Sequence, residues 1–293
     1  MRTSYAGYRM LLVHAHPDDE TINNGSTMAL YAALGAQVTL VTCTRGEEGE
    51  VLIPDLEHLA ASATDKLGDH RVTELAEAMK ALGVSDHRFL GEDKSGVATV
   101  KYRDSGMMGT PPNERPDSFW QADFAKATNQ LVKIIEEVKP HVLITYDEFG
   151  GYGHPDHIQA HRVAMAAADK SEWNIQKIYW NVTPKSVLQE GIDKMKEIGS
   201  DFLGADSADD LPFAKDDSFV HALVDGNLYV DKKMEAMRAH GTQIALDGPF
   251  FALSNNLGLQ VWGYEYYTRV KGEKAAPLTE AGYESDLFSG ISL

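Results

Sequence analysis

Two short polar clusters carry the residues of this chain that could bind a metal ion. The first, HAHPDDE, spans residues 14–20 and follows the apolar run MLLV. The second, DEFGGYGHPDH, spans residues 147–157 and follows the apolar run HVLITY. One such cluster could be a helix cap, because aspartate accepts the first backbone N–H groups of a helix. Two related clusters, each after a predicted buried strand, favour the two halves of one metal site.

The spacing of the side chains indicates which of them are ligands. Catalytic zinc takes about three protein ligands and keeps one position for water. His16 and Asp19 are three residues apart at the start of a predicted helix, so both can point to one centre. GHPDH offers His154 and His157, of which His157 continues into the next helix and is the more rigid. We therefore assign His16, Asp19 and His157 to one zinc ion per chain, although iron(II), manganese or cobalt would also suit these ligands. His14 is expected to pack behind the site.

The neighbouring side chains suggest hydrolytic chemistry. Asp18 lies beside the predicted ligands and is the natural general base for water activated by a metal ion. His154 can act as a general acid or stabilise an oxyanion from the opposite side. Tyr152 can add a hydroxyl donor, and Asp156 can fix the tautomer of His154. The chain contains no H-E-x-x-H, G-x-S-x-G or Walker motif that would favour another chemistry.

The elements that would position these clusters alternate between strand and helix. Predicted strands span 8–13, 36–44, 87–91, 141–146 and 176–183, and predicted helices span 25–35, 56–82, 119–139 and 158–170. This order predicts an α/β fold with an open, mostly parallel sheet and helices on both faces. Ligands of such sheets bind outside the carboxyl ends of the strands. The two clusters follow the first and fourth strands, so we expect them at the same edge.

The remaining chain is predicted to belong to the same unit. We expect a single catalytic domain over 1–293, with a core over 1–183 that holds the metal site. Residues 184–293 would form a less regular α+β extension that completes the fold, with a helix over about 231–244 and a strand over about 259–270. Residues 92–117 contain many Gly and Pro, which predicts a long loop, and such loops are usually functional or disordered.

The bulk composition limits the partners of the protein. Of its 293 residues 43% are hydrophobic, which is enough for an ordinary core. The formal net charge of −17 disfavours binding to nucleic acid. One cysteine, Cys43, cannot form a disulfide framework within the chain, and no apolar stretch has the length of a membrane span. We expect a cytoplasmic protein with a small-molecule substrate and no nucleic-acid or membrane partner.

The motifs also resemble a known family. AHPDDE together with GGYGHPDH is similar to the zinc-dependent N-acetylglucosaminyl deacetylases, which share a Rossmann-like fold. One branch of that family deacetylates N-acetylglucosaminyl-inositol in mycothiol biosynthesis. The segments similar to this branch are VTCTRGEEGEV (41–51), LGDHR (67–71), RDSGMMGT (103–110) and HVLITYDEFGGYGHPDHIQAH (141–161), followed later by AMRAHGTQI (236–244) and FALSNNL (251–257).

The resemblance implies an activity and further site residues. The chain would remove acetate from N-acetylglucosaminyl-inositol, with the metal ligands and the base assigned above. His154 would be the general acid, supported by Asp156, and Tyr152 would polarise the amide oxygen. Outside the two clusters, Arg71 and Asp104 would hold sugar hydroxyls. Glu50 and Met107 would lie near the substrate.

Three alternatives remain at this point. The mycothiol S-conjugate amidase cleaves a related amide whose acyl part is a bulky cysteine conjugate, but ETINNG (20–25) is more like the deacetylase. A deacetylase of another N-acetyl sugar is disfavoured by RDSGM (103–107). A non-catalytic sugar-binding protein on the same fold would be suggested by loss of Asp18 or of a ligand, and all of these residues are present.

Overall fold

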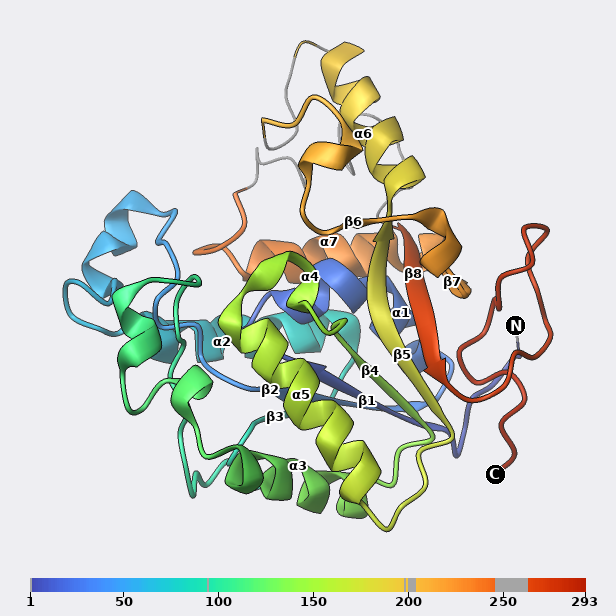
Figure 1. Cartoon of the computed structure of the whole chain (residues 1–293), viewed down its shortest axis with the longest axis horizontal. Coiled ribbons are helices and arrows are strands. Elements are labelled where there is room, and N and C mark those ends of the chain that lie inside the picture. Colours follow the sequence, from blue (N-terminus) through green and yellow to red (C-terminus); the bar gives the residue numbers. More distant parts are fainter. Residues whose placement is uncertain (1, 94, 198, 200–203, 246–262) are drawn as a thin grey trace.

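A twisted sheet runs through the molecule with strand order β3-β2-β1-β4-β5-β8-β7 (Figure 1). The computed structural model describes residues 2–93, 95–197, 199, 204–245 and 263–293. Five consecutive strands pair in parallel in the main sheet: β1 (Arg9–His14), β2 (Gln37–Thr42), β3 (Asp86–Phe89), β4 (Val142–Thr145) and β5 (Lys177–Pro184). Two strands are antiparallel: β8 (Tyr264–Lys271) pairs with β5, and β7 (Ala222–Asp225) pairs with β8. The short β6 (Ala214–Lys215) pairs in parallel with the end of β5.

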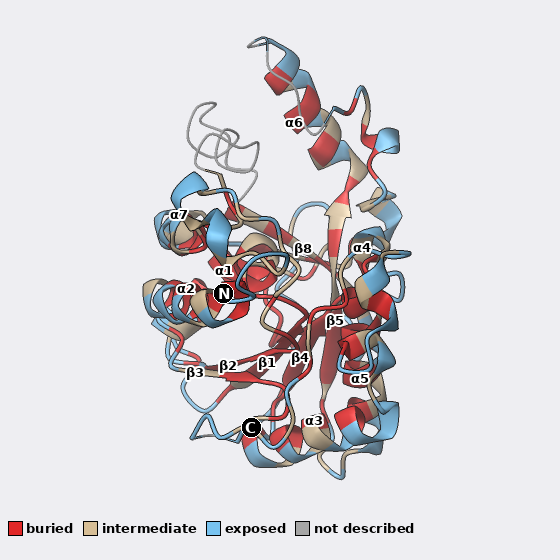
Figure 2. Ribbon diagram, turned by 90° about the vertical axis from the view of Figure 1, so that its left-hand side faces the viewer, coloured by how far each residue is buried: buried red, intermediate tan, exposed pale blue. Residues whose placement is uncertain are grey.

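Helices cover both faces of this sheet, as the sequence predicts. One core cluster packs α1 (Asp19–Ala33), α2 (Leu67–Leu82) and α7 (Val230–Ala239) on one face, and a second packs α3 (Phe124–Val138) and α5 (Pro155–Lys170) on the other. The central strands are therefore buried on both sides (Figure 2). The short α4 (Gly150–Gly153) precedes α5, and α6 (Lys185–Glu197) projects beyond the end of β5 (Figure 1). Short 3-10 helices span Pro54–Leu59, Pro111–Glu114, Phe119–Gln121, Ala208–Asp210, Asp217–Phe219 and Asn227–Tyr229.

The predicted fold class is confirmed, but two of the predicted helices begin later than expected. The helix predicted over 56–82 is a 3-10 helix followed by turns, and α2 begins only at Leu67. Asp65 has a φ of 55° and Thr64 Oγ1 donates to the His58 carbonyl over 2.6 Å, so polar turn residues interrupt the helix. The helix predicted from 119 begins at Phe124, where Asp123 accepts a hydrogen bond from the Lys126 backbone N–H.

The helices beside the two polar clusters begin earlier than predicted. α1 begins at Asp19 rather than at 25, because the Asp18 carbonyl already accepts the N–H groups of Thr21 and Ile22 over 3.0 and 2.9 Å. α5 begins at Pro155 rather than at 158, with His154 as its N-cap. The first cluster is therefore a short turn from β1 into α1, whereas the second contains the short helix α4 between β4 and α5.

The C-terminal part of the chain adds strands to the same sheet. The helix predicted over 231–244 corresponds to α7, which ends at Ala239, and the strand predicted over 259–270 corresponds to β8, with 259–262 outside the described residues. FALSNNL (251–257) also lies outside them. The division at residue 183 stays a prediction. In the part of the chain that the structure describes, no helix is long and apolar enough to cross a membrane.

Candidate active site

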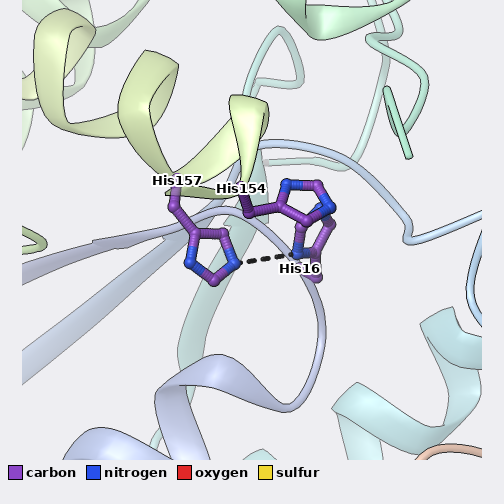
Figure 3. Close-up of side chains that lie close together, drawn as sticks. All are labelled: His16, His154 and His157. Carbon is purple, nitrogen blue, oxygen red and sulfur yellow. Dashed lines mark hydrogen bonds between the residues drawn. The ribbon is translucent and has the colours of Figure 1, made fainter. Parts of the chain in front are cut away.

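The two polar clusters meet at the carboxyl edge of the sheet, beside a cavity of about 610 Å³. They do so because β1 and β4 pair in parallel, with Leu12 opposite Ile144, so their following turns are neighbours. Figure 3 shows His16 from the turn after β1 beside His154 and His157 from the turn after β4. The expectation that both clusters share one edge is confirmed.

Three candidate ligand atoms form a nearly equilateral triangle. His16 Nδ1 lies 3.3 Å from Asp19 Oδ2 and 3.3 Å from His157 Nε2, and Asp19 Oδ2 lies 3.4 Å from His157 Nε2. Tetrahedral zinc with bonds of about 2.0–2.1 Å requires ligand atoms about 3.3–3.4 Å apart. The predicted ligand set therefore fits such an ion. His16, His154 and His157 also have ring nitrogens within 4.8 Å of one another, so His154 is the alternative third ligand.

Each histidine of the triangle has its other nitrogen fixed by a neighbour. His16 Nε2 lies 3.2 Å from Asp156 Oδ2 and 3.6 Å from Asp104 Oδ1, which places its proton on Nε2 and leaves Nδ1 for a metal ion. His157 Nδ1 lies 3.1 Å from the Gly150 carbonyl oxygen, which leaves Nε2 free in the same way. These contacts orient the rings before any ion binds.

Asp156 contacts His154 through its backbone rather than through its carboxylate. The carboxylate accepts hydrogen bonds from the backbone N–H and hydroxyl of Ser105 and faces His16, because the first turn of α5 directs it toward β1. Asp156 touches His154 through its backbone, whose N–H donates to His154 Nδ1 over 3.1 Å. The proton of a neutral His154 is consequently on Nε2. Burial, together with nearby His16 and His157, lowers the pKa of His154 to about 3.

Asp18 lies beside the triangle with its side chain 17% exposed. Arg71 Nη2 is 3.2 Å from Asp18 Oδ2. Burial raises the pKa of Asp18 to about 6, although Arg71 acts in the opposite direction. A carboxylate of this kind is suited to exchange protons near neutral pH.

Arg71 is a buried residue of α2 rather than an exposed one. It is 2% exposed and donates to the carbonyl oxygens of Pro17 and Gly46 as well as to Asp18. Gly46 has a φ of 67°, and a Cβ there would lie 2.0 Å from Arg71 Nη1, so only glycine leaves room for the guanidinium. Arg71 lines the cavity. Its predicted contact with sugar hydroxyls stays a prediction.

The other predicted substrate residues also line the cavity, at different depths. Asp104 is buried and accepts the Gly106 N–H over 2.8 Å. Glu50 is exposed, and Met107 is 52% exposed at the rim. Tyr152 in α4 is 41% exposed, with its ring centroid 6.2 Å from that of His154. All four border the same cavity, and their predicted roles toward a substrate stay predictions.

Sequence reasoning missed three residues around the triangle. The Tyr146 hydroxyl donates to Asp19 Oδ2 over 2.7 Å, Ser105 holds Asp156, and the Glu20 carboxylate accepts the Asp18 N–H. Tyr146 directly precedes the second cluster, and Ser105 belongs to RDSGM. These positions in the sequence could have indicated that both residues lie near the site. His14 is buried behind the site as expected, with Nε2 2.7 Å from Asn24 Oδ1.

Comparisons with known proteins agree with this arrangement. Residues 11–168 match the family described as PIG-L, GlcNAc-PI de-N-acetylase. A protein of Geodermatophilus obscurus named 1D-myo-inositol 2-acetamido-2-deoxy-alpha-D-glucopyranoside deacetylase is 56% identical, covering 97% of this chain and 98% of that protein. A protein of the same name from Streptomyces avermitilis is 51% identical and covers 97% of each chain. The structure of N,N'-diacetylchitobiose deacetylase from Pyrococcus horikoshii is 20% identical, with a TM-score of 0.56 over 90% of this chain and 84% of that one, which shows a shared fold.

A mostly parallel sheet with a histidine and aspartate cluster at its carboxyl edge, together with the family match over residues 11–168, defines the class: a hydrolase with an α/β fold that cleaves an amide. Within this class, the chain belongs to the PIG-L family of N-acetylglucosaminyl deacetylases. The family predicted from AHPDDE and GGYGHPDH is thereby confirmed.

Proposed function

We propose that this enzyme deacetylates 1D-myo-inositol 2-acetamido-2-deoxy-α-D-glucopyranoside, giving glucosaminyl-inositol and acetate in mycothiol biosynthesis. The observation that carries the proposal is the triangle of His16, Asp19 and His157 with Asp18 beside it at the wall of a cavity. The names of relatives at 51–56% identity over nearly the whole chain support the substrate.

We propose zinc as the ion, held by His16 Nδ1, Asp19 Oδ2 and His157 Nε2. When bound there, zinc would supply a Lewis acid and lower the pKa of a water molecule to about 7. The donor set supports this choice, since two imidazoles and one carboxylate are common ligands of catalytic zinc. Their pre-oriented rings would need little rearrangement to bind it.

The side chains around the triangle would move the protons. Asp18 would accept a proton from the attacking water. The general-acid role of His154 requires a protonated imidazole, which its burial disfavours. A neutral His154 instead has an Nε2–H to donate to the developing oxyanion, and Tyr152 can add a second donor. Asp18, once protonated, can deliver its proton to the leaving nitrogen.

The test is release of acetate by zinc-loaded protein from N-acetylglucosaminyl-inositol and from free N-acetylglucosamine. The proposal expects turnover of the first, a strong preference over the second, and loss of nearly all turnover in Asp18→Ala with metal content unchanged. A fully active Asp18→Ala variant would remove Asp18 as the base. Equal turnover of the two sugars would remove inositol as part of the recognised substrate.

A further inference from the structure

The backbone of Asp18 has a conformation that a non-glycine residue rarely adopts. Its φ is 120° and its ψ is −36°. This region is sparsely populated because the Cβ crowds the backbone, and such a residue persists only where its surroundings hold it. The surroundings of Asp18 should therefore include groups that fix both its backbone and its carboxylate.

A buried ion pair holds the backbone side. Glu20 Oε2 accepts the Asp18 N–H over 2.9 Å, and Glu20 Oε1 lies 2.9 Å from His240 Nε2. Both Glu20 and His240 are 0% exposed. The two carboxylate oxygens thus join His240, from the far end of the chain, to the amide of Asp18. Thr21 Oγ1 donates to the same carboxylate over 2.6 Å, which fixes its rotamer.

The turn that carries His240 is itself fixed against the core of the protein. It follows α7, and the Thr242 N–H and hydroxyl donate to the two carboxylate oxygens of Glu74 in α2 over 2.8 and 2.7 Å. Gln243 Nε2 donates to the Glu50 carbonyl oxygen over 2.9 Å. The segment AMRAHGTQI, which the sequence singled out without a role, is therefore a rigid support behind the first cluster.

A second support acts on the other side of Asp18. Arg71 donates to the Pro17 carbonyl oxygen and to Asp18 Oδ2. The residue is therefore held at the preceding carbonyl, at its own N–H and at its carboxylate. Substrate does not need to be present for these contacts, so they pre-organise the carboxylate.

We propose that Glu20 and His240 are positioning residues for the reaction: together they hold Asp18 in its strained conformation at the wall of the cavity. The inference rests on the proposed role of Asp18 as the base. Asp18 lines the cavity, whereas Glu20 and His240 do not. Any effect of Glu20 and His240 on turnover therefore acts through Asp18.

The experiment is a double-mutant cycle between His240→Gln and Asp18→Ala in zinc-loaded protein. His240→Gln should lower kcat by about tenfold or more, as small misplacements of a reacting group do. Its KM should stay within about threefold and its zinc content should not change, because the substrate contacts and the ligand atoms are untouched. In the Asp18→Ala background the same substitution should have no further effect on residual turnover. Glu20→Gln should behave like His240→Gln.

Lys177→Met is the matched control. Lys177 Nζ lies 2.6 Å from Glu284 Oε1, and this ion pair is as buried as that of Glu20 and His240. Lys177 is the first residue of β5, at the end of the strand away from the carboxyl edge. After the substitution, Arg269 still neutralises Glu284. It should lower the Tm and leave kcat unchanged. If His240→Gln behaves like this control, or lowers residual turnover of Asp18→Ala by the same factor as that of wild type, the positioning role is wrong. A fully active Asp18→Ala variant would instead refute the proposed base.

A stability measurement tests the strain even if His240→Gln does not fold. Asp18→Gly and Asp18→Ala both remove the carboxylate, but only glycine adopts a φ of 120° without strain. The glycine variant should therefore have the higher Tm, the reverse of the usual order at ordinary positions. An alanine variant that is as stable as the glycine variant would show that Asp18 is not strained and would overturn the proposal.

Discussion

At the scale of single residues, the site is organised by groups that orient the proposed ligands rather than by the ligands alone. Asp156 and the Gly150 carbonyl select the ring nitrogens of His16 and His157 that face the triangle. Ligand identity and ligand orientation are thus separable, and substitutions can test each of them.

His157→Ala should abolish stoichiometric metal binding. The substitution removes one corner of the triangle, and two remaining ligands hold zinc poorly. Metal content after dialysis, measured by inductively coupled plasma mass spectrometry, checks it. His161→Gln is the control, since His161 lies one turn further along α5 and contacts the Tyr146 carbonyl oxygen instead of the triangle. Unchanged zinc in His157→Ala would show that the third ligand is a different residue.

Asp156→Asn should weaken zinc binding by about 10- to 100-fold, the usual effect of removing a carboxylate that orients a ligating histidine. A competition titration with a chromophoric chelator measures the affinity. At saturating zinc, kcat should recover most of its wild-type value, because the Asp156 carboxylate faces His16. Unchanged affinity with a low kcat at saturating zinc would instead favour the support of His154 that the sequence suggested.

The residues of the site were predictable to different degrees. His16, Asp19 and His157 could be chosen because two related clusters of histidine and aspartate, each after a strand, are hard to explain as helix caps alone. The partner of the Asp156 carboxylate could not be predicted, because the direction of this side chain depends on where α5 begins. Glu20 and His240 are 220 positions apart, and no local pattern relates them.

At the scale of elements, the shared edge of β1 and β4 was predictable because parallel strands place their carboxyl ends together. The break before α2 was not predictable. Alanine and leucine around Ser62 and Thr64 continue a helical pattern in the sequence, although the chain forms turns there. The early start of α1 was missed for a related reason, because Asp and Asn are also typical of loops.

Gly46→Ala should reduce both stability and activity. Its φ of 67° is unfavourable for alanine by about 1–2 kcal/mol, and the new Cβ would also displace Arg71 from Asp18 and Pro17. Gly83→Ala provides a matched control, with a φ of 76° and nothing within 4 Å of the added Cβ. Chemical denaturation and kcat check the pair. Equal kcat in both variants would mean that Arg71 does not support Asp18.

At the scale of the whole molecule, the C-terminal segment completes the sheet through contacts far apart in sequence. β8 pairs with β5, and Glu284 then binds Lys177 from β5 and Arg269 from β8. Local periodicity says little about such an extension, because its strands are stabilised by distant partners. This is why β7 was not predicted, whereas the amphipathic α3 was.

Acid should destabilise the protein partly through Glu284. Burial alone would raise its pKa, but hydrogen bonds from Lys177 and Arg269 outweigh burial and hold the pKa below its ordinary value of 4.5. The stability from this group is therefore complete above pH 4.5 and is lost as the pH falls further.

Tm measured against pH should fall less steeply below pH 4.5 in Glu284→Gln than in wild type. Glu190→Gln, which removes an exposed pair with Lys194, should follow the wild-type slope. Identical slopes in all three proteins would exclude this contribution.

The central claim is that the enzyme is a deacetylase of the sugar-inositol amide rather than an amidase of mycothiol S-conjugates. The most direct measurement compares kcat/KM of zinc-loaded protein on N-acetylglucosaminyl-inositol and on a mycothiol S-conjugate, following free primary amine in both assays. The account predicts a large preference for the acetylated sugar-inositol. A large preference for the S-conjugate would contradict it and would make the protein an amidase on the same site.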